Sequence, residues 1–138
     1  MKYFLFNHSG CKNHGCEAIV RGTVNILNSA DENGQYVLSS YDALSDSILS
    51  NVESQQICRK PLNLLEMVIA FVDLKLNKSE RYSLKKLYSR LIHQADDCDV
   101  CLSIGGDTYC YGDNAGVQVL TECLKKSGKK VVLWARRK

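Results

Sequence analysis

A polar, glycine-containing segment near the start of the chain carries side chains that suit chemistry. It holds Asn13, His14 and Gly15, followed directly by Cys16 and Glu17. Asparagine and histidine are useful donors at a phosphate or sugar site, and a glutamate can hold or deprotonate a substrate hydroxyl. Asn13 also suits a helix cap, and Glu17 suits the first turn of a helix, where the helix dipole favours a carboxylate. Each residue has an ordinary structural explanation by itself, so the segment as a whole is the candidate.

A second segment of the same kind lies near residue 107. It contains Gly105, Gly106, Asp107 and Tyr109, and its Ser103 and Thr108 could bond a polyol or act as ordinary turn residues. Two carboxylates on two loops that converge would indicate a site. Glu17 and Asp107 are therefore the candidate catalytic residues. The candidate substrate-binding residues are Asn13, His14, Gly15, Gly105, Gly106 and Tyr109.

The elements around these segments are what would bring them together. An apolar run over residues 3–6 predicts a strand before the first segment, and helical spacing over 16–27 predicts a helix after it. Residues 99–104 and 114–126 repeat this arrangement around the second segment. Strands that alternate with helices favour an α/β, Rossmann-like fold with a mostly parallel sheet and helices on both faces. In such a sheet both segments lie at the carboxyl ends of the strands, where ligands bind.

The rest of the chain supplies supporting elements. Asn77 and Glu80 have capping-box spacing and predict the start of a helix. Residues 62–72 are the most apolar stretch, but they are far fewer than the roughly 20 needed to cross a bilayer. We expect a buried helix there, with attachment to a membrane surface as the lesser alternative. Further strands are predicted at 35–39, 54–58 and 130–134, and further helices at 62–76, after Asp42, and through Leu84, Leu87, Tyr88, Leu91 and Ile92.

The length and composition of the chain limit the classes of protein to which it can belong. The chain has 138 residues, which suits one domain, and a net charge of +3, which is too small to favour nucleic-acid binding. The start lacks the basic region and apolar stretch of a signal peptide. The seven cysteines are odd in number and irregularly spaced, so we expect free thiols and a cytoplasmic location.

Two groups of cysteines and histidines were considered as metal or redox sites. His8, Cys11, His14 and Cys16 are close in sequence, but their spacing does not match the usual paired zinc ligands. Cys98 and Cys101 form a CxxC pair that enters a strand, whereas a redox pair belongs at a helix start. We therefore expect core thiols, no metal and no cofactor.

Three motifs together resemble those of the polysaccharide pyruvyl transferases. Residues 13–19, Asn-His-Gly-Cys-Glu-Ala-Ile, resemble the Asn-x-Gly-Asp-Glu-Ala signature near the start of that family. Residues 103–107 followed by Tyr109 resemble its second glycine loop, and residues 129–134 resemble its next strand. The order and separation of the three fit, and the resemblance covers the whole chain. Cys16 departs from the family pattern, since the signature has aspartate there, while the neighbouring Glu17 is kept.

The resemblance implies both a fold and an activity. Family members have two Rossmann-like halves, similar to GT-B glycosyltransferases, and transfer a pyruvyl group from phosphoenolpyruvate to sugar hydroxyls of a bacterial surface polysaccharide. The acceptor would be a polysaccharide or a lipid-linked sugar. By resemblance, Asn13, Gly15 and Glu17 line the acceptor side of the cleft, with Gly105, Gly106 and Asp107 opposite.

The chain corresponds to the first half of that family. We therefore expect a domain truncated at its C-terminal end or one part of a split enzyme, with a separately encoded second half as partner. We expect little or no catalysis by the chain alone. Two alternatives stay open: half of a GT-B-like glycosyltransferase that uses a nucleotide-sugar, and a non-catalytic binding subunit or remnant.

Overall fold

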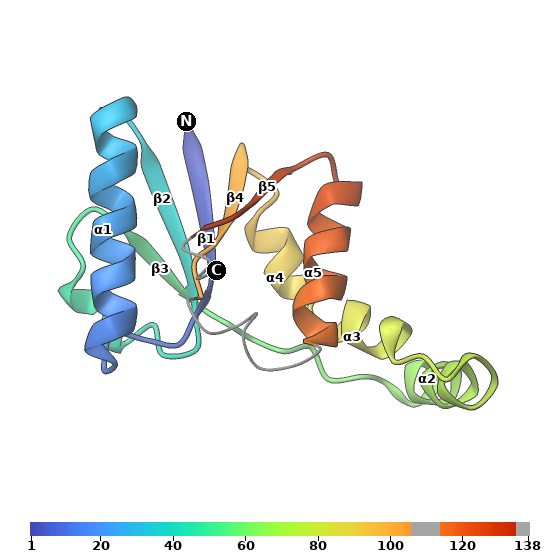
Figure 1. Ribbon diagram of the computed structural model, residues 1–138. Coiled ribbons are helices and arrows are strands. Elements are labelled where there is room, and N and C mark those ends of the chain that lie inside the picture. Colours follow the sequence, from blue (N-terminus) through green and yellow to red (C-terminus); the bar gives the residue numbers. More distant parts are fainter. Residues whose placement is uncertain (106–113, 135–138) are drawn as a thin grey trace.

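A single parallel sheet runs through the centre of the computed structural model, which describes residues 1–105 and 114–134. The strand order is β3-β2-β1-β4-β5, and all four neighbouring pairs are parallel (Figure 1). This confirms the predicted α/β fold and its parallel sheet. The strands are β1 (Lys2–His8), β2 (Gln35–Ser40), β3 (Glu53–Gln56), β4 (Val100–Ser103) and β5 (Lys130–Leu133).

Helices alternate with these strands along the chain, as the sequence predicted. Parallel neighbours need a crossover between them, and a helix is the usual crossover. The segment predicted as a short helix after Asp42 is a 3₁₀ turn. The helical elements are α1 (His14–Ala30), η1 (Ser45–Ile48), α2 (Leu64–Asn77), α3 (Arg81–Leu87), α4 (Ser89–Gln94) and α5 (Ala115–Lys126).

Alternate residues of β1 enter two separate cores, one on each face of the sheet. Tyr3 and Leu5 pack in the core that α1 covers, whereas Phe4 and Phe6 pack in the core beneath α4 and α5. Figure 1 shows α1 on one side of the sheet and α4 and α5 on the other. A strand with both faces buried is expected to be continuously apolar, which explains the run at residues 3–6. The prediction of helices on both faces is therefore confirmed.

The prediction of a buried helix at residues 62–72 is wrong. Helix α2 extends beyond α3, away from the sheet (Figure 1). Its apolar side chains are exposed, including Leu64 (76%), Phe71 (60%) and Leu76 (77%). Apolar content indicates that a helix favours a covered environment, but it does not say whether the described part of the chain supplies the cover.

Two predicted helix boundaries also need correction. The capping box lies at the start of α2, where Asn63 and Glu66 bond each other's backbone amides, and not at Asn77 and Glu80. The helix predicted through Leu84 and Ile92 is two helices, because Tyr88 leaves helical geometry between them. The apolar stripe continues across the break, which is why spacing alone did not show it.

Two further features of the described residues concern the cysteines and the lengths of the helices. All six cysteines among them are free thiols, and Cys98 and Cys101 are buried in the core. Among the described helices, each is too short or too polar to cross a membrane.

Candidate functional site

The C-terminal ends of the parallel strands form one edge of the sheet. At this edge β1 and β4 are neighbours, but the chain leaves them toward opposite faces of the sheet. The chain passes from β1 to α1 on one face and from β4 to α5 on the other. This is a topological switch point, the position where open α/β sheets bind ligands. Asn7 Nδ2 donates a hydrogen bond of 2.8 Å to Ser103 Oγ across the two strand ends. Gly105 is half-buried just beyond β4, while Gly106, Asp107 and Tyr109 lie outside the described residues.

Asn13 and Gly15 form the start of α1. Asn13 Oδ1 accepts hydrogen bonds from the backbone amides of Gly15 (2.9 Å) and Cys16 (3.4 Å). A Cβ at Gly15 would lie 3.1 Å from that same oxygen, so a side chain there would crowd the cap. The side-chain oxygen of Asn13 is therefore occupied by the helix, as its capping role predicts.

Glu17 lies on the first turn of α1, where it interacts with both His14 and Arg21. Glu17 Oε1 accepts from Arg21 Nε at 2.8 Å, and His14 Nδ1 lies 3.4 Å from Glu17 Oε2. The hydrogen bond from Arg21, and then that from His14, hold the pKa of Glu17 below its ordinary value. The His14 side chain is 94% exposed. A carboxylate held in this way accepts hydrogen bonds well but is a weaker base.

A cavity of about 300 Å³ opens at the same edge, on the face that α5 covers. Its floor is apolar and its rim carries phenol, amide and guanidinium groups. Glu17, His14 and Asn13 do not line it, so the structure separates the first candidate segment from this cavity. The lining residues are Asn7, Ser9, Tyr41, Ile57, Arg59, Tyr88, Leu91, Asn114, Gly116, Val117 and Leu120.

Arg59, Tyr41 and Tyr88 form the polar group at the rim of the cavity. A hydrogen bond with Tyr41, and then the nearby Tyr88, raise the pKa of the Arg59 guanidinium, which stays charged. Burial raises the pKa of Tyr88, so its hydroxyl stays protonated at neutral pH. A Cβ at Gly116 would lie 2.9 Å from Tyr88 Oη, so glycine allows α5 to approach this ring closely. One cation, two phenols and an apolar floor suit a ligand with hydroxyls and negative charge.

Sequence reasoning missed these rim residues. Tyr41 follows β2 and Arg59 lies shortly after β3. Ligands bind at the C-terminal ends of parallel strands, so the argument used for the segments after β1 and β4 applies to these two residues as well. Asn7 is near the end of β1 and has a positive φ of 68°, a conformation that asparagine tolerates better than most residues. The missing signal was the strand order, which places these ends beside one another.

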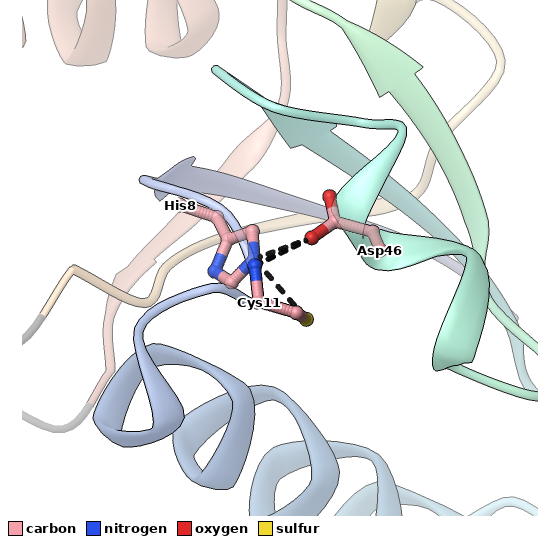
Figure 2. A group of neighbouring side chains, drawn as sticks. All are labelled: His8, Cys11 and Asp46. Atoms are coloured by element: carbon pink, nitrogen blue, oxygen red, sulfur yellow. Dashed lines mark hydrogen bonds and ion pairs between the residues drawn. The ribbon is translucent and has the colours of Figure 1, made fainter.

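A second group of functional side chains is buried beneath the first segment. Figure 2 shows His8 from the end of β1, Cys11 from the loop and Asp46 from η1 pointing toward one another. Nε2 of His8 lies 3.0 Å from Asp46 Oδ1 and 3.8 Å from Cys11 Sγ. Cys11 N also donates to Asp46 Oδ1 at 3.0 Å. Of the four residues weighed as metal ligands from the sequence, only His8 and Cys11 come together, while His14 and Cys16 lie outside this group.

The environment sets the protonation of this group. Burial, and then the hydrogen bond and charge of Asp46, raise the pKa of the Cys11 thiol to about 12. Burial alone would raise the pKa of Asp46, but the neighbouring groups of Ser40, Cys11 and His8 outweigh it and lower that pKa. The group therefore contains a protonated thiol beside an ionised carboxylate.

The chain was compared with known proteins at three levels. Neither the family models, nor the curated proteins, nor the solved structures include a match.

Proposed function

We propose that the chain is the acceptor-binding half of a transferase that moves a pyruvyl group from phosphoenolpyruvate to a bacterial surface polysaccharide or its lipid-linked precursor. The observation that supports this best is the cavity at the switch point, with Arg59, Tyr41 and Tyr88 at its rim. Phenol hydroxyls and amides can bond sugar hydroxyls, and the apolar floor can contact the carbon face of a ring. The proposed reaction is that of the pyruvyl transferase family, which the two glycine-containing segments resemble.

The proposed reaction joins two sugar hydroxyls to one carbon of the donor. The methylene carbon of phosphoenolpyruvate takes a proton, and one hydroxyl attacks the resulting cationic carbon while losing its own proton. Phosphate then leaves, and the second hydroxyl closes the ketal. A general acid that protonates the methylene carbon, a general base that takes the hydroxyl protons, and cationic phosphate ligands are required. Asp107 is the proposed base. Glu17 is not assigned this role, because it lies outside the cavity and its hydrogen bond from Arg21 lowers its basicity.

The first test is calorimetric titration of the chain with three probes: methyl β-galactopyranoside, phosphoenolpyruvate and uridine diphosphate glucose. We expect the sugar to bind and Arg59→Ala to weaken its binding by roughly 10- to 150-fold, because a hydrogen bond to a charged group contributes roughly 1.5–3 kcal/mol. Arg90→Ala is the matched control, since Arg90 is an exposed cation on α4 that does not line the cavity.

The same titration separates the alternatives. Binding of the nucleotide-sugar, with no binding of the simple sugar or phosphoenolpyruvate, would favour a glycosyltransferase half. Equal sugar binding by the wild-type protein and Arg59→Ala would show that the cavity is not the acceptor site. Binding is measured rather than turnover. By resemblance, the residues that hold the phosphate of phosphoenolpyruvate belong to the second Rossmann-like half of the family's enzymes.

A further inference from the structure

The buried side chains of His8, Cys11 and Asp46 offer one nitrogen, one sulfur and one oxygen donor to a common point. All three residues are at most 3% exposed, and their donor atoms lie within 4.8 Å of one another. They come from a strand end, a loop and a 3₁₀ turn, so their convergence is a product of the fold. We propose that these three residues bind one Zn²⁺ ion, which ties the loop before α1 to η1.

Two of the three separations between the donors are close to those of a zinc site. Zinc bonds of about 2.0–2.3 Å at tetrahedral angles place neighbouring donors about 3.3–3.6 Å apart. Nε2 of His8 lies 3.0 Å from Asp46 Oδ1 and 3.8 Å from Cys11 Sγ, on either side of that range. The third separation, from Cys11 Sγ to the Asp46 carboxylate, is within 4.8 Å, so an ion that binds all three donors needs these two groups to approach by up to about 1.3 Å. The mixture of imidazole, thiolate and carboxylate is also one that zinc accepts.

The geometry of the group differs from that of a catalytic relay. A Cys–His–Asp relay places the thiol and the carboxylate on opposite ring nitrogens, whereas here both lie at Nε2. Asp46 Oδ2 is buried and has no hydrogen bond of good geometry among the described residues, although the Ser40 hydroxyl interacts with this carboxylate and lowers its pKa. An unsatisfied buried carboxylate oxygen is costly, and a cation would remove that cost.

The charges also balance when the ion is bound. Binding displaces the Cys11 thiol proton to solvent, and the two positive charges of zinc then face one thiolate and one carboxylate. The buried group becomes neutral overall, which lowers the cost of burying charge. Oδ2 of Asp46 or a water molecule can complete the fourth position. The ion would join β1, the following loop and η1, segments already linked by the hydrogen bond from Cys11 N to Ser45 Oγ.

Cobalt titration of the reduced, chelator-treated 138-residue protein tests the site. We expect one equivalent of Co²⁺ to bind with a thiolate-to-cobalt charge-transfer band, and one equivalent of Zn²⁺ to displace it. Cys11→Ser should abolish the band. Cys16→Ser is the matched control, because Cys16 is a half-buried cysteine of the same segment that lies outside the group.

A second pair of variants tests the carboxylate. Zn²⁺ should raise the melting temperature of the wild-type protein and of Asp42→Asn, but not that of Asp46→Asn. Asp42 is a suitable control because it pairs with Lys12 at the surface. Circular dichroism establishes that each variant is folded.

X-ray absorption of the zinc-loaded wild-type protein keeps the test decisive if the variants fail to fold. We expect one sulfur ligand, with nitrogen or oxygen ligands in the remaining positions. Absence of stoichiometric uptake by the folded wild-type protein, a zinc ion with no sulfur or with two, or a charge-transfer band that persists in folded Cys11→Ser would each overturn the proposal.

Discussion

Asn13 stabilises the start of α1 through its side-chain oxygen, which accepts two backbone hydrogen bonds. Asn13→Ala should lower the free energy of unfolding by about 1 kcal/mol, because the first-turn amides lose their acceptor. Asn13→Asp should cost much less, since aspartate caps equally well and favours the positive end of the helix dipole. Urea unfolding of the three proteins measures this. Equal losses in both variants would show that the amide group has a role other than capping.

Cys101 and Cys58 differ in the environment of their thiols. Burial raises the pKa of Cys101 to about 11, whereas Cys58 is exposed. At about pH 8 roughly one Cys101 thiol in a thousand is ionised, and the thiolate is the form that reacts. We expect iodoacetamide to modify Cys58 well before Cys101 in the folded protein. Peptide mass spectrometry over time measures both rates, and urea-unfolded protein, in which the two should react alike, is the control.

At the level of helices and strands, the sequence predicted where each element lies better than it predicted what packs against that element. The positions of β1, α1, β2 and α5 follow from apolar spacing, which reports the burial of one or both faces. The exposure of α2 could not be predicted in this way, because spacing does not identify the covering element. Arg59 lines the cavity, and Asp46 belongs to the group with His8 and Cys11. Both residues are far along the chain from their partners, and the order of the strands in the sheet is what brings them close. The capping role of Asn13 was readable because it depends on adjacent residues alone.

Helix α2 is tied to its neighbours through Glu66 at its first turn. Oε1 of Glu66 lies 3.2 Å from Lys86 Nζ and 3.6 Å from Lys60 Nζ. The backbone amide of Asn63, and then these lysines, lower the pKa of Glu66 from its ordinary value of 4.5. A carboxyl with a lowered folded-state pKa stabilises the fold above its unfolded pKa. That contribution is lost as the pH falls below 4.5 through the folded-state pKa.

Glu66→Gln should reveal this contribution. Glutamine can keep the capping hydrogen bond but has no charge. The variant should therefore be less stable than the wild-type protein at about pH 7, and the difference should shrink as the pH falls below 4.5. Urea midpoints across this pH range measure the difference. Glu80→Gln, at an exposed carboxylate outside the capping box, should show no such convergence.

For the molecule as a whole, the sheet and α2 should differ in local stability. Strand β1 pairs with both β2 and β4 and buries side chains on both faces. Its amides should open only when the whole fold opens, whereas those of exposed α2 should open locally. Hydrogen exchange followed by mass spectrometry should therefore show the slowest exchange in peptides of β1 and β4 and fast exchange in residues 64–77.

Repeating this exchange measurement at several protein concentrations distinguishes an intrinsically weak helix from one that another surface covers. Protection of α2 that stays low at all concentrations would mean that its apolar side chains remain in water. Protection that rises with concentration, while β1 stays unchanged, would mean that a second molecule covers them. Protection as strong as that of β1 at every concentration would contradict the exposure of α2, because a helix without tertiary packing is marginally stable at this length.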